Sequence, residues 1–136
     1  MIRKIEHLGI AVNDMEKANR LFSMLLNKEP YKSEAVESEQ VNTSFFMLGE
    51  TKVELLSATG EASAIAKYIA KKGEGIHHIA MDVDDIDFEI NRLRAAGFEV
   101  INAAPKDGAD NKRICFLHPK STGGVLIELC EEKKQL

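Results

Sequence analysis

The sequence predicts an α+β fold in which two tandem β-α-β-β-β modules form a curved mixed sheet. Residues 5–15, IEHLGIAVNDM, recur in similar form as residues 76–86, IHHIAMDVDDI, which begin 71 positions later. Each copy closes with a short apolar run that holds one glutamate, at residues 53–56 and 126–129. A repeat of this kind indicates a duplicated module, and the alternation of apolar and polar residues is typical of strands.

The first module covers roughly residues 1–58. It starts with a strand at 3–12, and Asp14 then provides a good N-cap, because its carboxylate accepts hydrogen bonds from the unpaired N–H groups of a first helical turn. The helix that follows has one apolar stripe, formed by Met15, Ala18, Leu21, Phe22 and Leu25. Three further strands are predicted at 32–38, 42–48 and 51–57.

A connecting helix is predicted within residues 61–73. It follows Ser63, and its apolar residues are Ile65, Tyr68 and Ile69. It ends at Gly73, directly after two lysines. Cations suit the negative end of the helix dipole, and glycine suits the position just past a helix.

The second module covers about residues 75–131. A strand at 76–83 leads into a helix that follows Asp84 or Asp85, turns Ile86, Ile90 and Leu93 inward and stops at Gly97. The remaining strands are predicted at 98–102, 112–117 and 124–130, and residues 131–136 are predicted to form a solvent-exposed tail. We expect one domain over residues 1–136, because this length buries a core of ordinary size.

Composition narrows the possible partners and the compartment. The net charge of −4 argues against nucleic acid, which is usually bound by a basic surface, and no stretch is apolar enough for a membrane span. The start of the chain runs directly into a strand, so we expect no signal or transit peptide. Cys115 and Cys130 lack a Cys-x-x-Cys pattern, so we expect reduced core thiols and a cytoplasmic protein.

The repeat places one histidine and one glutamate at equivalent positions in each copy. His7 and Glu54 belong to the first copy, and His78 and Glu128 to the second. Alternation within the strands turns both glutamates away from the main apolar face, and small neighbours of the histidines leave room for a ligand. A lone histidine or glutamate on a strand is usually packed or solvated. The paired occurrence indicates a shared site instead.

Two imidazoles and two carboxylates suit a divalent ion of intermediate hardness. We expect Co²⁺, with Mn²⁺, Ni²⁺, Fe²⁺ or Zn²⁺ as alternatives, in a cleft around which the sheet would curve. An octahedral ion with four protein ligands keeps two positions for substrate or water. His77 points to the face opposite His78 and is interpreted as structural, whereas His118 lies at a turn and is expected to face substrate.

Four segments carry a resemblance to a known family: residues 5–12, 49–56, 73–80 and 116–129. The chain resembles the vicinal oxygen chelate superfamily and, over nearly its whole length, the methylmalonyl-CoA epimerases within it. The last two segments are typical of the epimerases, and the first two are shared more widely. The metal ligands of the family fall on His7, Glu54, His78 and Glu128, and the position of Glu54 is Gln in some members.

The resemblance implies interconversion of (2R)- and (2S)-methylmalonyl-CoA by metal-assisted removal and return of the C2 proton. It implies Glu128 as the catalytic base on one face of the substrate. On the other face, some members carry a glutamate where this chain has Thr43. Glu39 is our candidate for that role, with Glu37 or a metal-bound water as alternatives.

The implied substrate is an acyl-CoA, whose phosphates need cationic partners. His118 and Lys120 are the expected substrate-binding residues, and Lys112 and Arg113 are further candidates. We also expect a homodimer, because members of the superfamily often dimerise. Their sites lie either within one chain or across two, and the sequence leaves both arrangements open.

Two other functions remain open. A glyoxalase I-like lactoylglutathione lyase would explain the four ligands equally well, but not the segment from His118 to Ser121 followed by Gly123 and Gly124. A non-enzymatic small-molecule-binding protein of the same fold is the third possibility. The four intact ligands argue against it.

Overall fold

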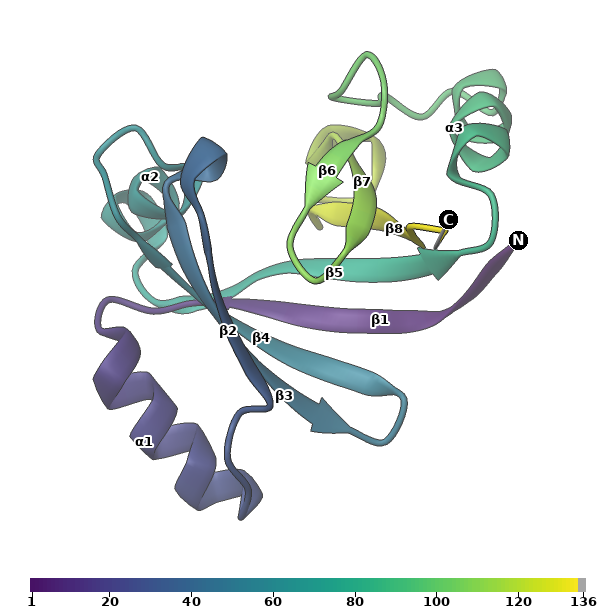
Figure 1. Ribbon diagram of the computed structural model, residues 1–136. Helices are drawn as coiled ribbons and strands as arrows, with labels where there is room; N and C mark the ends of the chain where they lie inside the picture. Colours follow the sequence, from purple (N-terminus) through teal and green to yellow (C-terminus); the bar gives the residue numbers. More distant parts are fainter. Residues whose placement is uncertain (135–136) are drawn as a thin grey trace. The chain divides into compact units, whose positions relative to one another are not determined.

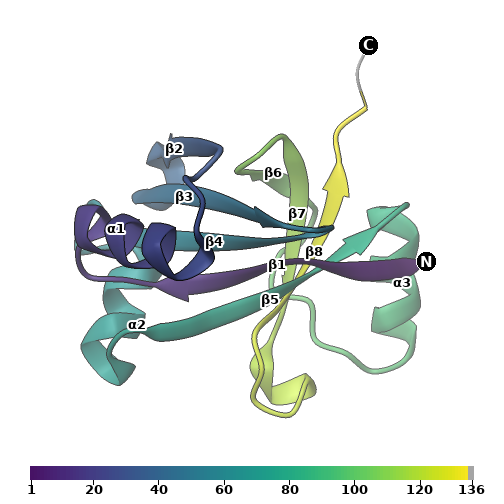
Figure 2. The same ribbon diagram turned by 90° about the horizontal axis from the view of Figure 1, so that it is seen from below.

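The computed structural model describes residues 1–134 and contains three α-helices and eight strands within them (Figures 1 and 2). The strands are β1 (Ile2–Ala11), β2 (Lys32–Val36), β3 (Val41–Leu48), β4 (Thr51–Ala58), β5 (Gly75–Val83), β6 (Lys106–Gly108), β7 (Lys112–Leu117) and β8 (Ile127–Glu132). The α-helices are α1 (Met15–Leu26), α2 (Ala64–Lys72) and α3 (Ile86–Ala95), and short 3₁₀ turns occur at η1 (Glu37–Glu39) and η2 (Pro119–Ser121). Both modules show the predicted order β-α-β-β-β.

By packing, the chain divides into two compact units. One unit is His7–His77, and the other combines Met1–Glu6 with the chain from His78 onward. The division therefore runs through β1 and β5, whereas the repeat in the sequence starts at these strands. None of the helices in residues 1–134 has the length and apolar character that a membrane crossing needs.

In the unit His7–His77 the strands follow the order β2-β3-β4-β1. β4 is antiparallel to β3 and parallel to β1. α1 begins at its expected cap, where the carboxylate of Asp14 accepts a hydrogen bond from the Lys17 N–H. It packs on one face of the strands, in a cluster of Val12, Ala18, Phe46, Val53 and Leu55.

The opposite face of the same strands is also covered. A second cluster joins Ala11, Val41 and Leu56 to Ile65 of α2. The cap of α2 is Ser63, whose hydroxyl accepts a hydrogen bond from the Ile65 N–H. Since both faces of β4 are buried, its central residues form a nearly continuous apolar run in which Glu54 is the charged exception.

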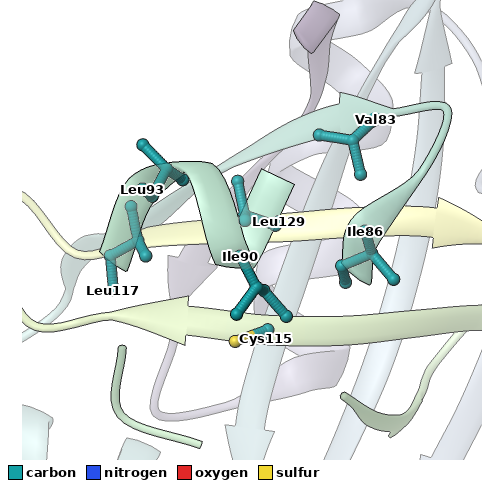
Figure 3. Close-up of a cluster of buried hydrophobic side chains, with 7 residues drawn as sticks. All are labelled: Val83, Ile86, Ile90, Leu93, Cys115, Leu117 and Leu129. Carbon is teal, nitrogen blue, oxygen red and sulfur yellow. The ribbon is translucent and has the colours of Figure 1, made fainter. Parts of the chain in front are cut away.

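In the other unit the strands follow the order β5-β8-β7-β6. α3 starts after Asp85, whose carboxylate accepts a hydrogen bond from the Phe88 N–H. Figure 3 shows its apolar side chains against β5, β7 and β8, in a cluster of Val83, Ile86, Ile90, Leu93, Cys115, Leu117 and Leu129. The opposite face of these strands carries Ala80, Ile114 and Cys130.

The predicted strand at 98–102 is wrong. Only one bridge forms there, between Val100 and Leu117. The ladder stops because the Phe116 N–H donates to the side-chain oxygen of Asn102, at 2.9 Å, instead of to a backbone carbonyl. The strand that pairs with β7 beyond this point is β6, which the sequence pattern did not indicate.

The C-terminal strand begins and ends later than predicted. β8 starts at Ile127 rather than at residue 124, because Gly123 and Gly124 adopt positive φ angles of 68° and 93° in the preceding turn. At its end, β8 includes Glu131, which pairs with Arg113 across the ladder and accepts a hydrogen bond from the Ile86 N–H. The predicted tail is therefore wrong for residues 131 and 132, and residues 135–136 lie outside the described part of the chain.

Candidate metal-binding site

The unit His7–His77 holds the first imidazole–carboxylate pair on adjacent parallel strands. Glu54 on β4 lies opposite Gly9 on β1, and His7 is two residues before Gly9, so both side chains share one face. The distance from His7 Nε2 to Glu54 Oε1 is 3.2 Å. The two residues are only 5% and 4% exposed, so this is a buried pair of ionisable groups.

The second unit holds a matching pair. Glu128 on β8 lies opposite Ala80 on β5, and His78 is again two residues before that partner. The distance from His78 Nε2 to Glu128 Oε2 is 3.5 Å, and both residues are buried. Each unit therefore presents one imidazole and one carboxylate at the same strand register.

The spacing within each pair fits coordination of an ion. Imidazole nitrogens and carboxylate oxygens bind ions such as Zn²⁺ at about 2.0–2.2 Å, so two ligand atoms at a right angle around the ion are about 3 Å apart. The observed 3.2 Å and 3.5 Å are close to that value. None of the four predicted ligands is a thiolate, which suits an ion of intermediate hardness.

An aromatic ring lies opposite each glutamate, and sequence reasoning missed this second repeat. Phe45 on β3 pairs with Glu54, and Phe116 on β7 pairs with Glu128. The Phe116 ring meets the His78 ring edge-on, with centroids 5.8 Å apart. Apolar walls of this kind limit the access of water to a metal site. Because loop lengths differ between the modules, only the strand register reveals the equivalence.

Cys130 is a further neighbour that the sequence did not assign to the site. Its thiol donates a hydrogen bond to Glu128 Oε1, with a sulfur–oxygen distance of 2.8 Å, and both residues are buried. One oxygen of Glu128 thus faces the thiol while the other faces His78. The sequence could have indicated this contact, because Glu128 and Cys130 are two residues apart on one strand, and such residues have their side chains on the same face.

His77 has a different environment from its neighbour His78. Its ring meets Tyr68 of α2 edge-on, with centroids 4.9 Å apart, and the Tyr68 hydroxyl donates to the Ile76 carbonyl. Burial lowers the pKa of His77 below its ordinary value. A neutral ring packed on α2 indicates a structural role.

The candidate second base does not lie on a strand. Glu39 ends the short turn η1 and is partly exposed. Thr43, two residues into β3, is buried, and its hydroxyl donates to the Glu34 carbonyl at 2.9 Å. The hydroxyl of Thr43 therefore ties β3 to β2.

The two predicted substrate-binding residues lie at η2 between β7 and β8: His118 directly precedes this turn and Lys120 is within it. The side chain of His118 caps this turn, because its Nδ1 accepts a hydrogen bond from the Lys120 N–H at 3.1 Å. In the neutral ring the proton then resides on Nε2, which is the nitrogen left to donate to another group. The side chain of Lys120 is exposed.

Known proteins are similar to this chain in sequence and in fold. The family model described as "Glyoxalase/Bleomycin resistance protein/Dioxygenase superfamily" matches residues 6–116. The ethylmalonyl-CoA/methylmalonyl-CoA epimerase of Cereibacter sphaeroides is 40% identical over 131 residues, which cover 95% of this chain and 98% of that protein.

Two solved structures are similar over almost the whole chain. A variant of the Streptomyces coelicolor methylmalonyl-CoA epimerase, in complex with 2-nitronate-propionyl-CoA, gives a TM-score of 0.94 at 33% identity, covering 98% of this chain and 100% of that one. A methylmalonyl-CoA epimerase in complex with methylmalonyl-CoA and NH4+ gives 0.93 at 33% identity, covering 97% and 96%. The chain belongs to the glyoxalase/bleomycin resistance protein/dioxygenase superfamily and, within it, to the family of the methylmalonyl-CoA epimerases. The predicted family and α+β class are confirmed.

Proposed function

We propose that this protein is an epimerase that interconverts (2R)- and (2S)-methylmalonyl-CoA. The observation that carries the proposal is the buried histidine–glutamate pair that each unit presents at the same register. Its family adds the substrate class, because relatives that match over nearly their full length bear the name of this activity. The C2 proton of the substrate lies between a thioester and a carboxylate, which makes it acidic enough for removal by a side chain.

His7, Glu54, His78 and Glu128 are the proposed ligands of one divalent ion. When bound, such an ion would stabilise the negative charge that develops on the thioester and carboxylate oxygens as the C2 proton leaves. The equivalent placement of the two pairs and their spacing support this assignment. Co²⁺ stays a prediction, with Mn²⁺, Ni²⁺, Fe²⁺ and Zn²⁺ as alternatives.

Glu128 is the proposed acid–base group on one face of the substrate. Its Oε1 is held by the Cys130 thiol and its Oε2 lies beside His78, so the carboxylate has a defined orientation. The Phe116 ring opposite it limits competition from water. A carboxylate held in this way can take the C2 proton and return it without leaving its position.

The acyl-CoA contacts are proposed to come from the turn before β8. His118 offers Nε2 as a donor, and Lys120 offers an exposed ammonium group for a phosphate or carboxylate. Arg113 is a weaker candidate, because its guanidinium is already paired with Glu131 and Asp87. A homodimer and a cytoplasmic location remain predictions. Cys115 and Cys130 are buried and not joined in a disulfide, which agrees with a reducing compartment.

Exchange of the C2 proton tests the proposal against both alternatives. Metal-loaded protein is incubated with (2R)-methylmalonyl-CoA in deuterium oxide, and deuterium at C2 and formation of the (2S) epimer are followed by NMR. A parallel reaction contains the hemithioacetal of methylglyoxal and glutathione. We expect exchange and inversion only with the CoA thioester. Turnover of the hemithioacetal alone would support a lactoylglutathione lyase, and binding without either reaction would support a non-enzymatic protein.

A further inference from the structure

Inversion at C2 needs a second acid–base group, on the face of the substrate opposite Glu128. A single base that removes and returns the proton on one side regenerates the same epimer. The group must be a side chain that can accept and donate a proton, and Thr43 cannot supply it near neutral pH. This inference rests on the proposed epimerase function.

The strand register of the unit His7–His77 identifies which side chains share a face with His7 and Glu54. Glu54 pairs with Phe45, and Phe45 pairs with Lys32 of β2. Two residues further along the strands, Leu56 pairs with Thr43, which pairs with Glu34. Directly opposed residues in a sheet point to the same side. Lys32 and Glu34 therefore project from the face that carries the histidine–glutamate pair.

Glu34 is the remaining carboxylate of that face. Among the described strand residues of this unit, Glu34 and Glu54 are the two carboxylates that project from this face. Glu39 lies in η1, past the end of β2, and has no place in the ladder. Strand spacing puts the Cα atoms of Glu34 and Glu54 about 12 Å apart, two strands and two residues away on the same face.

The surroundings of Glu34 suit proton exchange. Its carboxylate forms an ion pair with Lys32, with Oε1 3.2 Å from Nζ. The two side chains are 33% and 38% exposed, so the carboxylate is in contact with solvent from which a proton can be replaced. Thr43, which pairs with Glu34, has a short side chain whose hydroxyl donates a hydrogen bond to the Glu34 carbonyl. The Thr43 side chain is therefore held against the backbone of β2.

We propose that Glu34 is the second acid–base residue of the epimerisation. Glu34 would take the C2 proton of one epimer while Glu128 delivers a proton to the other face, and the roles reverse in the back reaction. No other reactant is needed, because the C–H bond broken on one side is replaced by a C–H bond formed on the other.

The test compares Glu34→Gln with Glu39→Gln and with Glu29→Gln, an exposed glutamate outside the strands. Each metal-loaded variant is incubated with pure (2R) or pure (2S) substrate in deuterium oxide. For Glu34→Gln we expect inversion to fall at least about 100-fold. One epimer should still exchange its C2 proton without inverting, because Glu128 remains. The bound metal per chain should be unchanged, and Glu29→Gln should behave like the wild type.

A second variant guards against a folding defect. Thr43→Glu added to Glu34→Gln places a carboxylate at the neighbouring position of the same face, and partial recovery of inversion is expected. Three results would overturn the assignment. The first is normal inversion by Glu34→Gln. The second is loss of both bound metal and exchange of either epimer in Glu34→Gln, and the third is one-sided exchange in Glu39→Gln. Absence of exchange by the wild type with either epimer would instead reject the proposed function itself.

Discussion

At the scale of single residues, the candidate site consists of two buried pairs, each formed by one imidazole and one carboxylate. A buried carboxylate is costly unless it is paired with a cation or bound to a metal. The Glu54 carboxylate lies 3.2 Å from the His7 imidazole, and the Glu128 carboxylate lies 3.5 Å from the His78 imidazole, within separate units. Replacing a proposed ligand should lower the metal content of the protein.

Substitutions of Glu54 separate the oxygen ligand from its charge. Glu54→Ala removes the ligand, and we expect most bound metal and most activity to be lost. Glu54→Gln keeps an oxygen at the same place, so metal should be retained. Metal analysis by mass spectrometry of both variants checks this, with Glu50→Gln in the exposed turn as the control. Full metal occupancy in Glu54→Ala would remove Glu54 from the ligand set.

Cys130 should matter through its hydrogen bond to Glu128 rather than through its size. Cys130→Ala removes the donor, and a lost hydrogen bond of about 1 kcal/mol corresponds to a rate about 5-fold lower. Cys130→Ser restores a donor and should recover most of the rate. C2 exchange rates of the two variants decide the matter. Cys115→Ala, which changes the thiol on the α3 side of the sheet, is the control. Equal rates for the Ala and Ser variants would contradict the prediction.

At the scale of elements, each strand that carries a proposed ligand also packs against a helix. β4 directs Glu54 to one face and Val53 and Leu55 to the other, where they pack beneath α1. β8 does the same with Glu128 and Leu129, which packs beneath α3. The helices therefore stabilise the strands from the side opposite to the ligands.

Leu55→Ala tests this separation of roles. Leu55 is fully buried next to Glu54 in sequence, so a cavity should lower the free energy of unfolding by about 2–5 kcal/mol. The ligands project from the other face, so bound metal per folded chain should be unchanged. Urea unfolding and metal analysis measure the two effects. Met24→Ala, at an 81% exposed position of α1, should change stability little. A large loss of metal in folded Leu55→Ala would show that the faces are coupled.

At the scale of the whole molecule, binding of the proposed ion would be coupled to folding of the chain. An ion that binds the folded chain but not the unfolded one adds stability that grows with the logarithm of its free concentration above the dissociation constant, about 2.7 kcal/mol at 100 times that constant. Removal of metal by a chelator should therefore lower the melting temperature, and added Co²⁺ should restore it. Calorimetry of both forms checks this. The double variant His7→Ala with His78→Ala is the control, and its melting temperature should not respond to Co²⁺.

The sequence by itself determined the local features and the repeat. Asp14 and Ser63 cap the helices that follow them, as does Asp85, one of the two aspartates that the sequence offered for α3, because capping depends on neighbours within one turn. The alternation within each strand gave the face of Glu54 and of Glu128, because side chains alternate with a period of two. The pairing of histidine with glutamate followed from the duplicated spacing.

Only the tertiary structure decided which residues lie opposite one another. Strand register places Phe45 opposite Glu54 and Phe116 opposite Glu128, and it places Glu34 on the same face as Glu54, two strands away. Residues 98–102 form only the bridge between Val100 and Leu117, because the Phe116 N–H donates to the Asn102 side chain instead of to a backbone carbonyl. Beyond this point β7 pairs with β6. Period-two alternation tells which face a side chain occupies within its own strand. The partner across the ladder depends on loop lengths and on hydrogen bonds between segments far apart in the chain, which the packed fold alone establishes.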